Sequence, residues 1–208
     1  MIIITDILDC EQYLDQADAI IFDLDDTLYS EKDYVRSGYS AVAAAFEHVE
    51  NMEAKLWEAF VKKLPAIDGV LEAEGIFDPQ NKEKALHAYR SHMPDINLYP
   101  GVAQLLLRLK QSKKLGLITD GRPEGQWAKI RALGISGSFE KIIVTDDLGG
   151  VAYRKPNEAA FLLMQQALDV PFEKMVYIGD NAKKDFIAPR KLGMKTVHFK
   201  NKDGLYTE

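Results

Sequence analysis

The sequence predicts an α/β fold: a doubly wound (Rossmann-like) parallel sheet with an all-helical cap inserted after the first core strand. Three observations predict it. Short, continuous apolar runs alternate with segments of helical periodicity, which is typical of parallel strands covered on both faces. These runs stop abruptly at aspartate, threonine or glycine. After the first run, a long stretch rich in alanine, glutamate and lysine interrupts the alternation, and this composition favours helices.

The predicted core strands are short and end at polar chemistry. In chain order they are AIIFD ending at Asp23, LGLITDG ending near Thr119, KIIVTDD ending near Asp146, MVYIGD ending at Asp180, and KTVHF over 195–199. Segments with helical spacing of apolar residues, such as 102–109 and 159–167, lie between them. Ligands of open α/β sheets bind beyond the carboxyl ends of the strands. We therefore expect these polar ends to converge on one crevice.

The helical insertion is expected over residues 31–97, which leaves 1–30 and 98–208 for the core. Its helices are separated by the breaks PAIDG and FDPQ. An insertion that leaves the core directly after the first strand lies where a lid over the crevice is needed. Residues 1–17 precede the first predicted strand and carry no readable role.

Composition restricts the partners and the compartment. The chain has 26 basic and 32 acidic residues, a net charge of −6, and no long Lys/Arg run, so neither nucleic acid nor a membrane surface is an expected partner. Cys10 is the only cysteine, which excludes an intrachain disulfide and a thiolate zinc cluster. With no signal-peptide pattern at the start and no apolar run of about 20 residues, a cytoplasmic protein is expected. The oligomeric state is not predicted.

Three strand-end aspartates predict a cation site. Asp23 and Asp25 are two positions apart, so in extended chain both can face the same side. Two such carboxylates repel each other unless a cation lies between them. Asp180 supplies a third oxygen donor. A few carboxylates together with a substrate phosphate are the ligands that suit Mg²⁺.

Phosphate-binding groups follow another strand end. Thr119 offers a hydroxyl, Gly121 allows the backbone to approach a ligand, and Lys155 brings a positive charge that Asp185 can anchor. Mg²⁺ and the lysine would neutralise a phosphoryl group, so that a carboxylate can attack it. Asp25 would then protonate the leaving alkoxide and later activate water. The pattern predicts phosphoryl transfer.

These residues resemble the haloacid dehalogenase superfamily in its phosphatase branch. The motifs occur in the family's order: DLDDT from Asp23, ITDG with Thr119, RKP with Lys155, and GDNAKKD from Gly179 to Asp185. The resemblance implies that Asp23 is the nucleophile and Asp25 the general acid/base. It implies that Mg²⁺ is held by Asp23, the Asp25 carbonyl and Asp180. It also implies that phosphate is bound by Thr119, Asp120, Gly121 and Lys155, and that the lysine and the metal are supported by Asp185 and Asn181. The implied substrate is a small phosphorylated metabolite, either a sugar phosphate or a nucleoside monophosphate.

The sequence departs from the branch's usual pattern at Asp120 and from the superfamily's dehalogenases at Asp25, and two alternative functions stay open. Asp120 stands where this branch often has asparagine, which adds a negative charge near the site. Arg122 is a possible substrate contact. Asp25 argues against dehalogenation, because displacing halide needs no protonation of an alkoxide. The alternatives to a phosphatase are a sugar phosphomutase that uses the same aspartyl-phosphate, and a non-catalytic binding or regulatory module on this fold.

Overall fold

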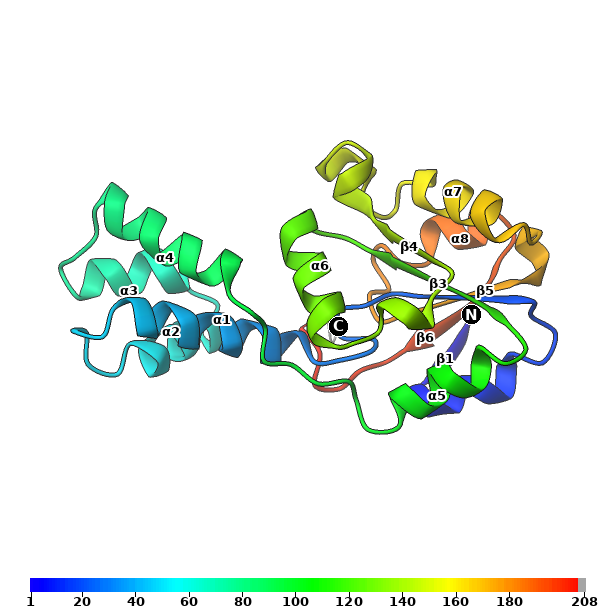
Figure 1. Cartoon of the computed structure of the whole chain (residues 1–208), viewed down its shortest axis with the longest axis horizontal. Helices are drawn as coiled ribbons and strands as arrows, with labels where there is room; N and C mark the ends of the chain where they lie inside the picture. Colours follow the sequence, from blue (N-terminus) through cyan, green and yellow to red (C-terminus); the bar gives the residue numbers. More distant parts are fainter. Residues whose placement is uncertain (206–208) are drawn as a thin grey trace. The chain divides into compact units, whose positions relative to one another are not determined.

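The computed structural model, which describes residues 1–205, contains a single sheet of six parallel strands (Figure 1). The strand order is β1-β6-β5-β2-β3-β4. The strands are β1 (Ile2–Ile4), β2 (Ala19–Phe22), β3 (Lys114–Thr119), β4 (Lys141–Val144), β5 (Met175–Gly179) and β6 (Lys195–Phe199). The α/β fold with a parallel sheet is thus confirmed.

The residues before the first predicted strand belong to this sheet. β1 lies at its edge and pairs with β6, Ile2 opposite Val197. It is followed by a 3-10 helix, η1 (Ile7–Tyr13), which packs against α5 (Val102–Leu109). Glu11 and Arg108 join the two helices through an ion pair of 2.8 Å. The first 17 residues therefore extend the core by one strand.

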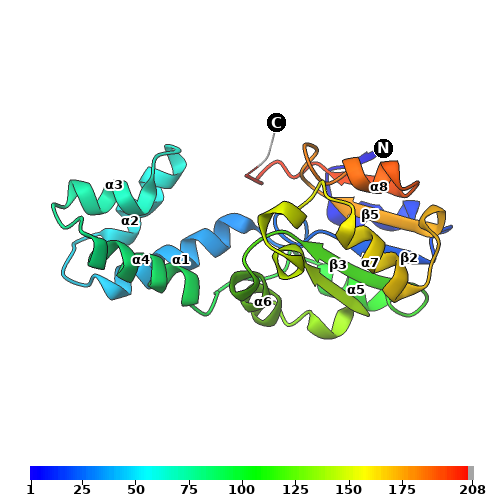
Figure 2. The ribbon, with the colours of Figure 1, turned by 90° about the horizontal axis from the view of Figure 1, so that it is seen from above.

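The chain winds in both directions from β2, which places helices on both faces. Crossovers between parallel strands are right-handed, so reversing the direction of travel along the sheet moves the helix to the other face. α5 and α6 (Pro123–Ala132) accompany the steps towards β4, and α7 (Ala159–Leu168) and α8 (Ile187–Lys191) accompany the steps back towards β6. α7 and α8 share one apolar cluster with the sheet, and Figure 2 shows the layers from above.

The buried strands explain why the apolar runs are continuous. All of β2 and β5 is buried, because helices cover both faces of the central strands. Phe22 lies opposite Leu117 of β3 and Ile178 of β5. The residues that follow these strands therefore leave the sheet at the same edge. The remaining connections contain short 3-10 turns: η2 (Ser136–Ser138), η3 (Thr145–Leu148), η4 (Val151–Tyr153) and η5 (Phe172–Lys174).

The chain divides into two compact units. One comprises residues 1–31 and those from 97 onward; the other comprises 32–96. The second unit is built from α1 (Glu31–Ala45, from its second residue on), α2 (Met52–Val61), α3 (Ala66–Ala73) and α4 (Pro79–Ser91). It has its own apolar core, to which Val42, Phe46 and Leu56 contribute. Asp78 caps the start of α4, because its side chain accepts a hydrogen bond from the Asn81 amide at 2.8 Å.

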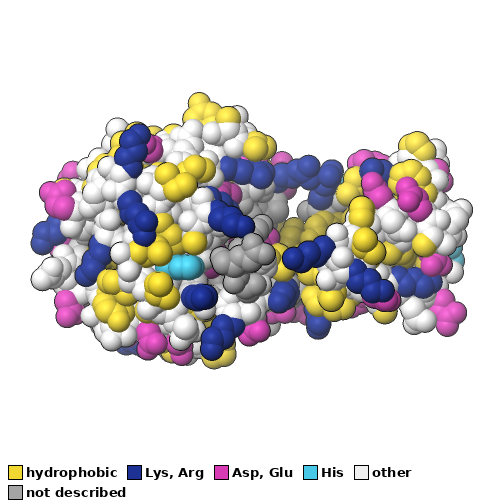
Figure 3. All heavy atoms as spheres, turned by 180° about the vertical axis from the view of Figure 1, so that it is seen from behind, with side chains coloured by type: hydrophobic (Ala, Val, Ile, Leu, Met, Phe, Trp, Pro, Cys, Tyr) yellow, Lys and Arg dark blue, Asp and Glu magenta, His cyan; other side chains and the backbone are white. Residues whose placement is uncertain are grey.

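Acidic and basic side chains are both present on the visible surface of each unit (Figure 3). Within residues 1–205, no helix has the length and apolar character that crossing a membrane requires.

Candidate active site

A polar cavity of about 460 Å³ lies at the carboxyl edge of the central strands. The switch of winding direction beside β2 puts it where ligands of doubly wound sheets bind. Every residue that lines it belongs to the sheet-containing unit. The lining residues are Asp23, Asp25, Glu31, Asp120, Gly121, Gln126, Arg154, Lys155, Asp180, Asn181 and Lys184.

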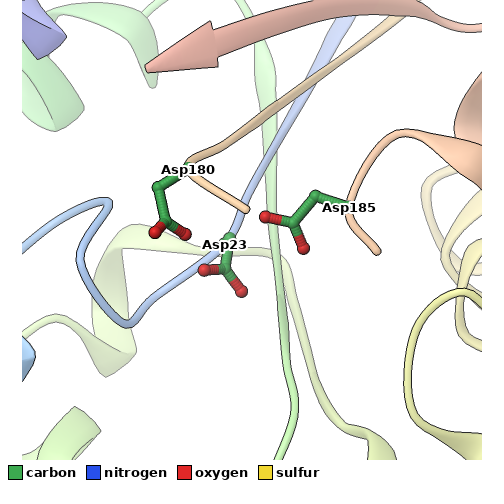
Figure 4. Close-up of side chains that lie close together, drawn as sticks. All are labelled: Asp23, Asp180 and Asp185. Carbon is green, nitrogen blue, oxygen red and sulfur yellow. The ribbon is translucent and has the colours of Figure 1, made fainter. Parts of the chain in front are cut away.

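Three buried carboxylates form the centre of the site. Asp23 directly follows β2, Asp180 directly follows β5, and Asp185 lies in the loop after it. One oxygen of each lies within 4.8 Å of those of the other two, and Figure 4 shows the carboxylates turned towards a common space. Asp23 is 4% exposed, Asp180 6% and Asp185 0%. Burying three carboxylates together is costly unless positive charge lies beside them.

Lys155 supplies part of that charge. Its Nζ lies 2.5 Å from Asp23 Oδ1 and 2.8 Å from Asp185 Oδ1, and it donates to the Tyr177 hydroxyl at 2.9 Å. Burial disfavours its positive charge, but the Asp185 and Asp23 carboxylates outweigh this and raise the pKa of Lys155 well above its ordinary value. The lysine is therefore a permanent cation between the nucleophile candidate and Asp185.

One ammonium does not balance three carboxylates. Burial, with a further contribution from Asp185, raises the pKa of Asp23 to about 7 although Lys155 opposes the shift. Burial and the neighbouring Asp23 raise the pKa of Asp180 to about 9. With all three ionised and Lys155 charged, two negative charges are in excess. An oxygen-only donor set with this excess fits a hard divalent cation such as Mg²⁺.

The Asp25 side chain lines the same cavity, but it lies outside the carboxylate group formed by Asp23, Asp180 and Asp185. Its Oδ1 accepts hydrogen bonds from Lys129 Nζ at 2.7 Å and from the Tyr29 hydroxyl, and its Oδ2 accepts one from Gln126 Nε2 at 3.1 Å. Burial opposes its ionisation, yet the charge of Lys129 and these hydrogen bonds lower the pKa of Asp25 below its ordinary value.

The residues after β3 are bound to the rest of the site. Thr119 is fully buried, and its hydroxyl donates to Gln126 Oε1 at 3.2 Å. Asp120 Oδ1 accepts from the Thr145 hydroxyl and from the Lys155 backbone amide, both at 3.0 Å. Its Oδ2 accepts from Lys184 Nζ at 2.8 Å.

These contacts explain how a carboxylate is accommodated at position 120. Burial disfavours its charge, but Lys155 and Lys184 lower the pKa of Asp120 below the ordinary value. The extra negative charge seen in the sequence is therefore compensated by Lys184, and Asp120 joins the loops that follow β3, β4 and β5.

Asp185 is fixed by backbone contacts as well as by Lys155. Its Oδ2 accepts from the Asn181 amide at 2.9 Å. A Cβ at Gly179 would lie 2.5 Å from that same oxygen, so glycine is required by this contact. Asn181 itself lines the cavity and accepts a hydrogen bond from the Lys183 amide through its side chain.

Some residues lie apart from the expected site or enter it unexpectedly. Arg122 is exposed at the start of α6 and is absent from the cavity lining. Asp146 forms a bidentate ion pair with Arg154, with donor distances of 2.8 and 2.7 Å.

Sequence reasoning missed Glu31, Gln126, Lys129, Arg154 and Lys184. Gln126 and Lys129 had one signal, a three-residue spacing on the helix that follows ITDG.

The chain is similar to several known proteins. Residues 20–199 match the family model described as haloacid dehalogenase-like hydrolase. A glyceraldehyde 3-phosphate phosphatase of Methanopyrus kandleri is 30% identical over 88% of this chain and 83% of its own. One of Methanocaldococcus jannaschii is 30% identical over 86% and 82%. A magnesium-bound hydrolase of this fold from Bacillus subtilis superimposes with a TM-score of 0.62 at 20% identity, covering 86% of this chain and 85% of its own.

Proposed function

The chain belongs to the haloacid dehalogenase-like hydrolases, and from that premise we propose that it is a Mg²⁺-dependent phosphatase of small sugar phosphates that acts through an aspartyl-phosphate. The observation that carries the proposal is the contrast between two aspartates two residues apart. Asp23 lies among Lys155, Asp180 and Asp185, whereas Asp25 is bound to a separate set of donors. The first environment gives Asp23 the neighbouring positive charge that attack on a phosphoryl group requires. The second keeps the Asp25 carboxylate apart from the group formed by Asp23, Asp180 and Asp185, so that it can exchange a proton with the leaving oxygen and with water.

Asp23 and Asp180 would hold the metal ion with their carboxylates, and the Asp25 carbonyl is the third expected ligand. When bound, the ion neutralises charge on the phosphoryl oxygens and lets an anionic nucleophile approach. Asp185 is less available to the metal because one of its oxygens faces Lys155 and the other accepts from the Asn181 amide. It therefore holds Lys155 in place.

In the first half of the reaction, an Asp23 oxygen forms a bond to phosphorus while the ester P–O bond breaks. The electron pair of that bond goes to the ester oxygen, which takes a proton from Asp25, and the alcohol leaves. Lys155 remains beside Asp23 and stabilises negative charge on the transferring group. Asp120 and Gly121 line the same cavity, and their backbone amides are the proposed donors to the remaining phosphoryl oxygens.

In the second half, Asp25 takes a proton from water as the water oxygen attacks phosphorus. The bond between phosphorus and Asp23 breaks, its electron pair returns to the carboxylate, and inorganic phosphate leaves. Asp25 is then protonated for the next turnover. The net change is ester plus water to alcohol plus phosphate.

The proposed substrate class is a short sugar phosphate. Two relatives that match most of the chain are named glyceraldehyde 3-phosphate phosphatases. The cavity is polar and carries Lys155, Lys184 and Arg154 beside its carboxylates, which suits a phosphate joined to a hydroxylated carbon chain. We propose further that the helical residues 31–97 act as a cap that selects among such substrates.

The test is phosphate release from glyceraldehyde 3-phosphate, larger sugar phosphates and nucleoside monophosphates, with Mg²⁺ and with EDTA. We expect metal-dependent release that is greatest with the triose phosphate and is lost in Asp23→Asn. Asp15→Asn, at an exposed position in the same unit, is the matched control and should retain full activity. Interconversion of sugar phosphates without release would indicate a mutase, and release unaffected by Asp23→Asn would contradict the mechanism.

A further inference from the structure

The Asp25 carboxylate is held on both of its oxygens, and this gives those two atoms different roles. We propose that Lys129 and Gln126 of α6 are positioning residues that make Oδ2 of Asp25 the atom that carries the catalytic proton. Lys129, together with Tyr29, occupies Oδ1, and Gln126 orients Oδ2 towards the cavity. The inference rests on the phosphatase function proposed above and concerns how its general acid is aimed.

Oδ1 has no remaining capacity to accept. A carboxylate oxygen has two lone-pair sites, and those of Oδ1 receive Lys129 Nζ and the Tyr29 hydroxyl. Neither donor lines the cavity; Tyr29 is fully buried and Lys129 is 4% exposed. Both donors therefore hold Oδ1 from the protein side, and a substrate oxygen has no site on it.

Among residues 1–205, Oδ2 receives a single hydrogen-bond donor, which leaves one of its two lone-pair sites open. Its donor is Gln126 Nε2 at 3.1 Å, and Gln126, unlike Lys129 and Tyr29, lines the cavity beside Asp25. The amide of Gln126 is itself fixed, since Nε2 also donates to the Asp120 carbonyl at 2.8 Å and Oε1 accepts from Thr119. Gln126 thus holds Oδ2 at the cavity while leaving it one position for a proton or a leaving oxygen.

The local structure of α6 explains how two of its side chains reach one carboxylate. The helix begins at Pro123, immediately after the ITDG loop, and residues three apart lie on the same helical face. Gln126 and Lys129 are both buried on that face, while Arg131 on the same helix is exposed. A buried ammonium requires a carboxylate partner, so the Lys129–Asp25 pair at 2.7 Å fixes both groups.

This arrangement predicts an effect that depends on the leaving group. A sugar alkoxide needs the Asp25 proton as the ester P–O bond breaks, whereas acetate or p-nitrophenolate leaves without one. Removing Lys129 also removes a charge that lowers the pKa of Asp25, but a protonated carboxyl group that is not aimed at the leaving oxygen cannot deliver its proton. Loss of the Oδ1 contact should therefore still slow alkyl phosphates and largely spare activated ones. The value of kcat/KM is the appropriate measure, because it reports steps only up to the departure of the leaving group.

The experiment compares kcat/KM for glyceraldehyde 3-phosphate with that for acetyl phosphate and p-nitrophenyl phosphate, at saturating Mg²⁺. General acid catalysis is typically worth about 10²–10⁴-fold. We expect Lys129→Met to lose at least about ten-fold more on the alkyl ester than on the activated phosphates, and Lys129→Arg to recover most of the difference. Gln126→Met should show the same selectivity, which keeps the test open if Lys129→Met does not fold. Arg131→Met is the matched control on α6 and should leave both rates unchanged.

Equal losses on all substrates, in folded variants, would show that Lys129 and Gln126 have a structural role only and would overturn the inference. Unchanged rates would overturn it as well. Failure of the proposed function itself is distinguishable, because the wild-type protein would then release phosphate from none of these compounds.

Discussion

Asp120 shows how a single departure from the family pattern is accommodated by its neighbours. The carboxylate accepts from Thr145, from the Lys155 amide and from Lys184. An asparagine of the same shape would keep an oxygen for the first two donors but would lose the charge that binds Lys184. The carboxylate therefore restrains a lysine that lines the cavity.

This gives a prediction for Asp120→Asn. Removing one negative charge and releasing Lys184 should strengthen binding of inorganic phosphate, so that its inhibition constant falls at least about three-fold, equivalent to roughly 0.6 kcal/mol. Product inhibition of the Mg²⁺ enzyme is the measurement. Lys184→Met combined with Asp120→Asn should abolish the gain. An unchanged inhibition constant in Asp120→Asn would show that Lys184 does not reach phosphate.

The residues at the strand ends were predictable because neighbouring parallel strands end at the same edge of a sheet. Asp23 and Asp180 directly follow β2 and β5, which are neighbours, so the register of the two strands places them at one edge. Gln126 and Lys129 were not predictable in the same way. Their relation to Asp25 depends on long side chains that reach across from a helix, at sequence separations of 101 and 104 residues. Charged or polar residues with this helical spacing are equally typical of a solvent-exposed helix face, so the sequence alone does not show that these two are buried.

At the level of elements, the turn after β5 is the most tightly constrained. Gly179 ends the strand, and the loop immediately folds Asp185 back against it. The Asn181 amide and Lys155 then fix the two oxygens of that carboxylate. Strand, glycine and loop thus form one unit that orients the lysine.

Gly179→Ala should disrupt this unit. Its Cβ would lie 2.5 Å from Asp185 Oδ2 and 3.0 Å from Asp185 Cγ, so the carboxylate must move. Overpacking of this kind costs about 1–3 kcal/mol, and we expect a loss of that size in the free energy of unfolding in urea, together with a fall in kcat. Gly137→Ala is the control, because a Cβ there meets nothing within 4 Å. Equal stability of the two variants would contradict the account.

The elements themselves were predictable to different degrees. Continuous apolar runs identified β2, β3, β4, β5 and β6, since strands buried on both faces leave no polar alternation. β1 was missed because three residues at a sheet edge carry too little pattern. The 3-10 helix η1 was missed for a related reason. It is short, and its position depends on packing against α5, which the sequence pattern does not show.

For the whole molecule, the excess acid in the core links stability to pH and to metal. In the metal-free protein, Asp23, Asp180 and Glu31 have pKa values raised to about 7, 9 and 8, above ordinary values of 3.8 or 4.5. The folded state therefore binds more protons than the unfolded state between about pH 4 and pH 9. By linkage, the free energy of unfolding must fall as pH rises through that window.

We expect urea unfolding in EDTA to give a free energy of unfolding that decreases from pH 5 to pH 9 by at least about 1.4 kcal/mol, the equivalent of one pKa unit. Mg²⁺ should reduce this slope, because a bound cation favours the ionised carboxylates. Asp180→Asn should reduce it without metal. A free energy that rises over the same range in EDTA would show that these carboxylates are not destabilising when ionised.

If Asp23 carries the phosphoryl group and Asp25 moves the proton, the two residues can be separated by peptide mapping of acid-quenched enzyme by mass spectrometry. Asp25→Asn, mixed with acetyl phosphate and Mg²⁺, should accumulate a phosphoryl group on Asp23, because an activated leaving group needs no proton but hydrolysis of the acyl phosphate needs the base. Asp23→Asn should remain unmodified. A phosphoryl group on any other residue, or an unmodified Asp25→Asn enzyme that still releases phosphate, would contradict the account.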